Sequence, residues 1–132
     1  MAATTEVLKS ITVEWSVDIQ KLAGVIEALG DTLRNTTACT AAMTGSEGDM
    51  AAAVRADLDC IDICQALRQV LTRATADAAV LRGMLLATVA ACERSAAECG
   101  RHAQHHAHCR LCSEGTKATA AACRGLLEDL GH

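Results

Sequence analysis

Eight cysteines are the residues of this sequence best suited to chemistry, and five of them lie in one stretch, Cys92 to Cys123. Four of the five histidines fall inside the same stretch. The cysteines there recur at steps that include three, seven and eleven residues, which return a side chain to one face of an α-helix. The spacing predicts rows of thiols along helix faces. Thiolates bind soft ions, so the rows indicate a metal-lined helical core.

Two pairs of cysteines have the spacing to clamp one ion from a single helix. Cys60 and Cys64 are four residues apart, and Cys109 and Cys112 are three apart. Two thiolates suit Cu(I), so eight cysteines would hold at most about four ions unless sulfurs are shared. Zinc prefers about four ligands, which Cys109, Cys112 and two nearby histidines could supply. Redox chemistry at this Cys-x-x-Cys is not favoured, because the sequence lacks a thioredoxin-like βαβ pattern.

Helices must position these rows, because the chain has no proline, one aromatic residue and many Ala and Leu. Apolar and cysteine positions recur in steps of three and four. They predict a short leading helix within 1–15 and four long helices over 17–44, 50–73, 78–102 and 106–130. Glycine-rich residues 45–49 and residues 103–107 are predicted turns, and Asp77 is a predicted N-cap.

Short connections between four long helices predict an antiparallel bundle. When the rows are followed in alternating directions, all four place aliphatic residues at one end and sulfur at the other. Met43 and the histidine cluster then lie at the rim of the sulfur end. We therefore expect an all-α protein, an antiparallel four-helix bundle with a short N-terminal extension, forming a single domain over 1–132.

Charge and hydropathy narrow the classes of function. The formal net charge of −4 argues against a nucleic-acid partner, which favours a basic surface. No apolar run reaches the roughly 20 residues of a membrane span, and the first twenty residues lack a signal-peptide pattern. We expect a cytoplasmic protein with no membrane partner. Thiols stay reduced in the cytosol, so the cysteines are better explained as ligands than as disulfides.

Four short motifs resemble the cytosolic copper-storage proteins, a family of cysteine-rich four-helix bundles. They are Asp-Cys-Ile-Asp-Ile-Cys at 59–64, Glu-Cys-x-x-His at 98–102, His-His-x-His-Cys-Arg-x-Cys at 105–112 and Ala-Cys-Arg-x-Leu at 122–126. The resemblance covers roughly residues 30–130. It implies a lumen lined with cysteines that hold many Cu(I) ions, with His and Met passing copper in at the open end. It also implies a homo-oligomer, often a tetramer.

The family pattern, laid on this chain, gives fifteen positions that should line the lumen, and we call them the stripe positions. All eight cysteines occupy stripe positions. The other seven are Thr32, Thr36, Met43, Thr88, Ser95, Thr116 and Thr119. Threonine is a poor ligand for Cu(I), but its hydroxyl can bond the carbonyl four residues earlier in its own helix. The substitutions predict a lumen that keeps its shape and has a reduced capacity for copper.

The predicted ligands are the eight thiols with three further side chains from the rim. They are Cys39, Cys60, Cys64, Cys92, Cys99, Cys109, Cys112, Cys123, His102, His106 and Met43. His102 and His106 continue the row of the helix over 78–102, whereas His108 is expected outside the lumen. Asp57, Asp59 and Asp62 are interpreted as solvated charges. No residue is predicted to be catalytic.

Three functions follow from these patterns. The first is storage of Cu(I), with zinc as a lesser possibility for the metal. The second is an enzyme on the same bundle that uses copper to oxidise a small molecule held in a partly polar lumen. The third is a metal-free bundle that serves only in protein assembly. The thiol rows and the rim histidines favour storage over the other two.

Overall fold

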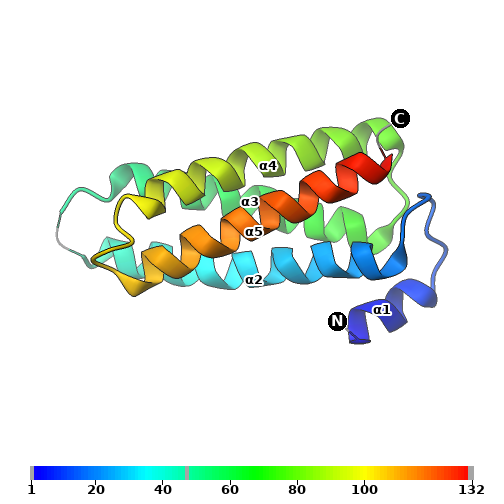
Figure 1. Cartoon of the computed structure of the whole chain (residues 1–132), viewed down its shortest axis with the longest axis horizontal. Coiled ribbons are helices and arrows are strands. Elements are labelled where there is room, and N and C mark those ends of the chain that lie inside the picture. The colour runs from blue at the N-terminus through cyan, green and yellow to red at the C-terminus, as the bar shows by residue number, and fades with distance from the viewer. Residues whose placement is uncertain (1, 47, 131–132) are drawn as a thin grey trace.

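The protein is described here by a computed structural model that covers residues 2–46 and 48–130, and it is all-helical (Figure 1). The helices are α1 Ala2–Lys9, α2 Ile19–Thr44, α3 Ala51–Arg73, α4 Ala78–Gly100 and α5 Ala107–Leu130. The predicted fold class is confirmed, with four long helices in a bundle and α1 as the N-terminal extension. No strand occurs within the described ranges.

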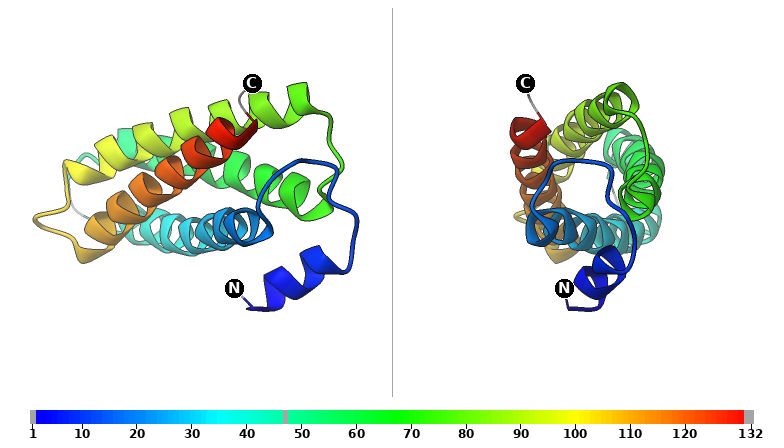
Figure 2. Two further views of the ribbon diagram at one scale, coloured as in Figure 1. Left: turned by 45° about the vertical axis from the view of Figure 1, so that its right-hand side comes forward. Right: turned by 90° about the vertical axis from the view of Figure 1, so that its right-hand side faces the viewer.

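The four long helices form a closed ring in which each packs against two neighbours. The packed pairs are α2 with α3, α3 with α4, α4 with α5, and α5 with α2. Figure 2 shows the ring end-on, with α1 lying outside it against α2. Because successive helices run in opposite directions, the connections before α3 and α5 share one end of the bundle. We call this end the open end, and the opposite one the closed end.

Capping side chains and backbone turns set the helix boundaries. Asp18 accepts hydrogen bonds from the backbone N–H groups of Gln20 and Lys21 at 2.7 and 3.1 Å and so caps α2. The predicted N-cap Asp77 does the same for α4 through the N–H of Val80 at 3.0 Å. At the end of α3, Ala74 adopts a left-handed conformation with φ 58°, which stops the helix.

Some boundaries differ from those predicted. The leading helix ends at Lys9, and residues 11–18 form an irregular segment. Helix α4 ends at Gly100, two residues early, so His102 belongs to the turn that follows. The other long helices agree with the sequence to within two residues. The predicted turn at 45–49 connects α2 to α3, although its Glu47 lies outside the described residues.

Aliphatic side chains fill the closed end. They are Leu22, Leu29, Leu67, Leu71, Leu81, Leu85 and Leu126, all without solvent exposure. The segment before α2 covers this end: Trp15 is buried and its indole N–H donates to the Ala76 carbonyl at 2.7 Å. The Glu14 N–H donates to the Ala74 carbonyl at 3.0 Å. The lumen is therefore sealed by leucine and tryptophan on the side away from the cysteines.

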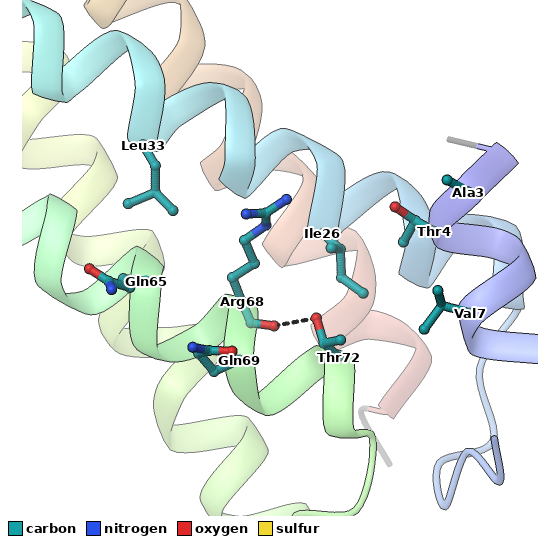
Figure 3. Close-up of a pocket in the computed structure, with 9 residues that line it drawn as sticks. All are labelled: Ala3, Thr4, Val7, Ile26, Leu33, Gln65, Arg68, Gln69 and Thr72. Carbon is teal, nitrogen blue, oxygen red and sulfur yellow. Dashed lines mark hydrogen bonds between the residues drawn. The ribbon is translucent and has the colours of Figure 1, made fainter. Parts of the chain in front are cut away.

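A groove of about 490 Å³ lies outside the bundle, between α1, α2 and α3 (Figure 3). Val7 and Ile26 line the groove on one side, and polar side chains of α3 line it on the other. Arg68 extends across the groove over Gly30, where a β-carbon would approach its Nη2 to 3.1 Å. The groove contains no cysteine among its lining residues, so it is separate from the predicted metal site.

Candidate metal centre

The stripe positions line the interior of the bundle as predicted. All eight cysteines are free thiols with no solvent exposure. The seven substituted positions are buried as well, from 0% for Thr32 to 2% for Met43. The 4-3 spacing therefore identified the inward faces of the helices correctly, and hydroxyls replace thiols in the same interior layer.

Three cysteines form the most compact sulfur cluster, which we call the three-thiol group. Cys60 and Cys64 come from α3, and Cys92 comes from α4. Each pair of sulfurs is 3.7 Å apart, so the three atoms mark an equilateral triangle. The group belongs to the same buried cluster as the leucines of the closed end. Its three sulfurs are close enough to bind one ion together.

Nearer the open end lies a second cluster, the open-end group, made of Cys39, Asp57, Cys99 and Cys112. The Cys99 and Cys112 sulfurs are 3.5 Å apart. Asp57 accepts hydrogen bonds from the Ser95 hydroxyl at 2.6 Å and from the Cys99 thiol at 3.3 Å. The cluster therefore offers three thiols and one carboxylate to an ion.

The interpretation of Asp57 as a solvated charge is wrong. Its side chain has no solvent exposure, and burial raises its pKa from 3.8 to about 7, although the Ser95 hydrogen bond opposes the rise. Asp59 and Asp62 are exposed, as expected. The sequence did contain a signal: Asp57 lies three residues before Cys60 and continues the inward row of α3.

A third cluster, the rim group, joins Cys39 and Cys109 to His108. The His108 Nδ1 lies 3.3 Å from the Cys39 sulfur and 3.5 Å from the Cys109 sulfur. The expectation that His108 lies outside the lumen is therefore wrong. It is four residues before Cys112, which places both side chains on one face of α5. Partial burial lowers the pKa of His108, which favours the neutral imidazole that binds metal.

The other predicted rim residues are placed as follows. His102 and His106 are half-buried in the turn between α4 and α5, and neither joins a metal-binding cluster among the described residues. The His106 ring centroid is 5.2 Å from that of His108. Met43 is 2% exposed and packs in a buried cluster with Cys39 and Met50.

Cys123 stands apart from the three clusters. It is fully buried on α5, but it shares no metal-binding group with the other described residues. Burial alone raises the pKa of its thiol to about 12. A thiol outside the three metal-binding groups is the weakest of the eight as a metal-binding residue.

Within the clusters, one thiolate at a time is stabilised by its neighbours. Hydrogen bonds from Cys64 and Cys92 lower the pKa of Cys60, and the same contacts raise the pKa of those two partners. In the open-end group, hydrogen bonds from Cys39 and Cys99 lower the pKa of Cys112 in the same way. The three-thiol and open-end groups thus each favour one thiolate, and a bound cation is needed to replace the protons of the other thiols.

The threonine hydroxyls at the substituted positions form hydrogen bonds within the protein. Thr36, Thr88 and Thr116 donate to the carbonyl four residues earlier, at 2.6, 2.8 and 2.9 Å, as the sequence predicted. The hydroxyl oxygens of Thr32 on α2 and Thr119 on α5 instead form a hydrogen bond with each other at 2.7 Å. On α2 and α5, the threonines at 32, 36, 116 and 119 therefore form a buried threonine wall, which shares these helices with Cys39, Cys109, Cys112 and Cys123.

Comparison with known proteins identifies the class. Residues 18–128 match the model of the copper storage protein family, so the chain belongs to that family. The resemblance inferred from the motifs is confirmed. No curated protein sequence matches the chain significantly.

Solved structures of one relative match almost the whole fold. The Streptomyces lividans copper storage protein Ccsp, loaded with 10 copper equivalents, superposes with a TM-score of 0.90 at 35% identity, over 96% of this chain and 98% of that one. Ccsp, described as cytosolic and carrying five coppers, superposes with a TM-score of 0.80 at 38% identity, over 85% and 96%. A Ccsp variant with two histidines replaced by alanine gives 0.81 at 37%, over 86% and 98%.

Proposed function

We propose that this protein stores Cu(I) in the cytosol, with the cysteine thiolates of the lumen as ligands. Family membership supports copper as the cargo. The observation that carries the proposal is the burial of eight reduced thiols in one interior, closed by leucines at the far end. Thiolates are soft ligands and select Cu(I) over hard cations. Burial keeps the bound ion away from solvent and from competing thiols.

The related Ccsp is described as cytosolic, which supports the proposed location. The described helices include none long and apolar enough to cross a membrane.

We propose that copper enters at the open end. His108, Cys109 and Cys39 offer a nitrogen and two sulfurs at the rim, and Cys39 also belongs to the open-end group. An ion can therefore pass inward by exchanging ligands. His106 and His102 in the turn are proposed to deliver it, and Met43 to provide a thioether.

The capacity of the lumen should be lower than fifteen thiols would give. Eight thiols at two per ion hold about four Cu(I), and sulfur sharing raises this number. Cys123 contributes least, because it has no neighbouring ligand in the described clusters. The threonine wall supports this proposal, since its hydroxyls already bond to backbone or to each other.

We propose that the protein is not an enzyme. A copper oxidase would need room for a substrate beside the metal. The hydroxyls of Thr36, Thr88 and Thr116 instead turn back onto their own helices. Both described cavities lie on the outer surface, one against α1 and one between α3 and α4. We therefore assign the lumen to copper rather than to a small molecule.

The test is an anaerobic titration of the reduced protein with Cu(I) against a colorimetric chelator. Saturation at three or more equivalents is expected, and Zn²⁺ at the same concentration should not displace the copper. One or two equivalents would favour a single defined site and reopen the enzyme alternative. A failure to compete with the chelator would refute storage.

Two matched variants sharpen the titration. Cys112→Ser removes a sulfur that touches Cys99 at 3.5 Å and should lower the number of copper ions held. Cys123→Ser removes an equally buried sulfur that lies outside the three metal-binding groups and should lower that number less. Equal losses in both variants would contradict the proposed distribution of copper.

We also propose that the chain forms a homo-oligomer, in line with the family resemblance. Leu58, Leu86 and Leu111 on α3, α4 and α5 are about half-exposed and are available for contacts between copies. Light scattering on the reduced protein tests this directly, and a monomer at micromolar concentration would contradict it.

A further inference from the structure

The three-thiol group has a geometry that fits an ion with three sulfur ligands. An equilateral triangle with sides of 3.7 Å has its centre about 2.1 Å from each sulfur, and metal–thiolate bonds are about 2.3 Å long. An ion at that bond length therefore lies about 0.9 Å out of the plane of the three sulfurs. The fit is pyramidal, with the ion at the apex, and it requires no movement of α3 or α4.

The charge around the group favours the same kind of ion. Cys60, Cys64 and Cys92 have no solvent exposure and share a cluster with leucines such as Leu67 and Leu85. The arginines of the two helices lie outside: Arg94 is paired with the exposed Asp59 at 2.8 Å. A net charge buried without a partner is costly.

The valence of the ion decides that net charge. Three thiolates around a monovalent ion carry −2, around a divalent ion −1, and around a trivalent ion zero. The open-end group is different, because its Asp57 carboxylate adds a further negative charge. Asp57 also accepts a hydrogen bond from the Cys99 thiol. The neutral, pyramidal site is therefore confined to the three-thiol group.

We propose that the three-thiol group binds a trivalent metalloid of the arsenous acid class, a second cargo besides copper. The three thiols replace the three hydroxyls of the neutral hydroxide. Three sulfur–arsenic bonds form, and each hydroxyl leaves with a thiol proton as water. No atom is oxidised or reduced. The ligand enters the lumen uncharged and leaves a neutral complex behind.

The test uses the full chain carrying Cys39→Ser and Cys99→Ser. These substitutions break the open-end and rim groups and keep the three-thiol group intact. The reduced variant is titrated with sodium arsenite under anaerobic conditions, in the presence of a phosphine reductant. Native mass spectrometry should show one arsenic bound per chain with loss of three hydrogens. X-ray absorption should show three sulfur ligands and no oxygen.

In this background, Cys64→Ser should weaken arsenic binding at least tenfold, and Cys92→Ala should do the same. The matched control is Cys123→Ser, which also removes a buried thiol of the lumen but lies outside the three metal-binding groups, and it should bind arsenic as its parent does. Circular dichroism establishes that each variant is folded. No arsenic bound to the folded parent, or equal binding after Cys64→Ser, would overturn the proposal.

The two cargoes can be judged separately. Arsenic binding does not require copper storage, so the unsubstituted protein is titrated with each ion alone. Copper without arsenic would overturn this inference and leave the proposed function intact. Arsenic binding without copper binding would overturn the proposed function and leave this inference intact.

Discussion

At the scale of the residue, two side chains determine how the open end works. Asp57 places a carboxylate among thiols, where it accepts hydrogen bonds from Ser95 and Cys99. His108 places an imidazole nitrogen 3.3 Å from Cys39. One adds a buried carboxylate to the interior, and the other offers a nitrogen ligand beside the thiols of the rim group.

Asp57 should make the metal-free protein less stable as pH rises. Its pKa is about 7 when folded and near 3.8 when unfolded, so the folded state holds the extra proton between those values. The cost is absent below about pH 4 and complete above pH 7, with an upper limit of about 4 kcal/mol. Asp57→Asn should remove this loss in urea unfolding of the reduced protein.

The control for this experiment is Asp59→Asn, which changes an exposed carboxylate paired with Arg94. Its pH dependence should follow the unsubstituted protein, because an exposed pair contributes little. If Asp57→Asn keeps the same pH dependence as its parent, the buried charge is not the cause.

His108→Ala should slow the uptake of copper several-fold and leave the final number of ions nearly unchanged. The imidazole contacts Cys39 and Cys109 at the rim but is not part of the deeper clusters. Stopped-flow transfer from a weak copper donor measures the rate. His105→Ala, at an exposed position of the turn that precedes α5, is the matched control.

The same measurement on His102→Ala and His106→Ala tests the original assignment of these two residues as rim ligands, which stays a prediction. A slower rate in either variant would support their proposed role in delivery. A rate as slow in the His105→Ala control would show that histidine content, rather than position, governs uptake.

At the scale of the element, each helix carries its ligands on one stripe, and the helices differ in how much sulfur they keep. The three-thiol group comes from α3 and α4, whereas α2 keeps one cysteine and α5 three, and both carry threonines at their other stripe positions, namely Thr32, Thr36, Thr116 and Thr119. The threonines hold the spacing of the helices without supplying soft ligands. A stripe position can therefore lose its sulfur without a change in how the helices pack.

Restoring two thiols to this wall should raise the capacity. Thr36→Cys with Thr116→Cys adds one sulfur to α2 and one to α5, each next to an existing cysteine row, and should add about one Cu(I) per chain. Loss of two hydroxyl hydrogen bonds should cost roughly 1 kcal/mol each at most. Anaerobic chelator titration and thermal unfolding measure the two effects.

The matched control is Thr37→Cys with Ala118→Cys, which places two thiols on the exposed faces of the same helices. It should add no copper that survives competition with the chelator. An equal gain in both variants would indicate that added thiols bind copper wherever they lie.

The sequence predicted the interior well, because helical spacing alone decides which face a residue occupies. It failed where polarity was weighed against spacing: Asp57 is on the inward row of α3, yet its charge was taken as evidence of exposure. The sequence also placed the end of α4 two residues late. His102 and His106 continue the spacing of α4, but the helix stops at Gly100, so helical spacing does not position these two side chains, and their role as rim ligands stays a prediction.

At the scale of the whole molecule, the bundle has two ends with different tasks. Leucines and Trp15 close one end, and thiols with His108 occupy the other. The fold therefore depends on the closed end, because the aliphatic layer supplies most of the apolar burial.

Leu71→Ala should separate folding from copper binding. The side chain is fully buried in the closed end, and its truncation should lower the free energy of unfolding by about 2–5 kcal/mol. The number of copper ions bound by the folded variant should not change. Urea unfolding and the chelator titration measure the two quantities. The exposed Leu86 provides the control, and Leu86→Ala should change neither by more than a small amount.

The lone indole offers a consequence of a different kind. Trp15 is the only aromatic side chain of the sequence, and its N–H is bonded to the Ala76 carbonyl at the end remote from the thiols. Its emission spectrum thus reports on the seal of the bundle, because unfolding of the closed end exposes the indole to water. The intrinsic fluorescence of the protein can therefore follow loss of this end during unfolding, through a single residue that is not a metal ligand.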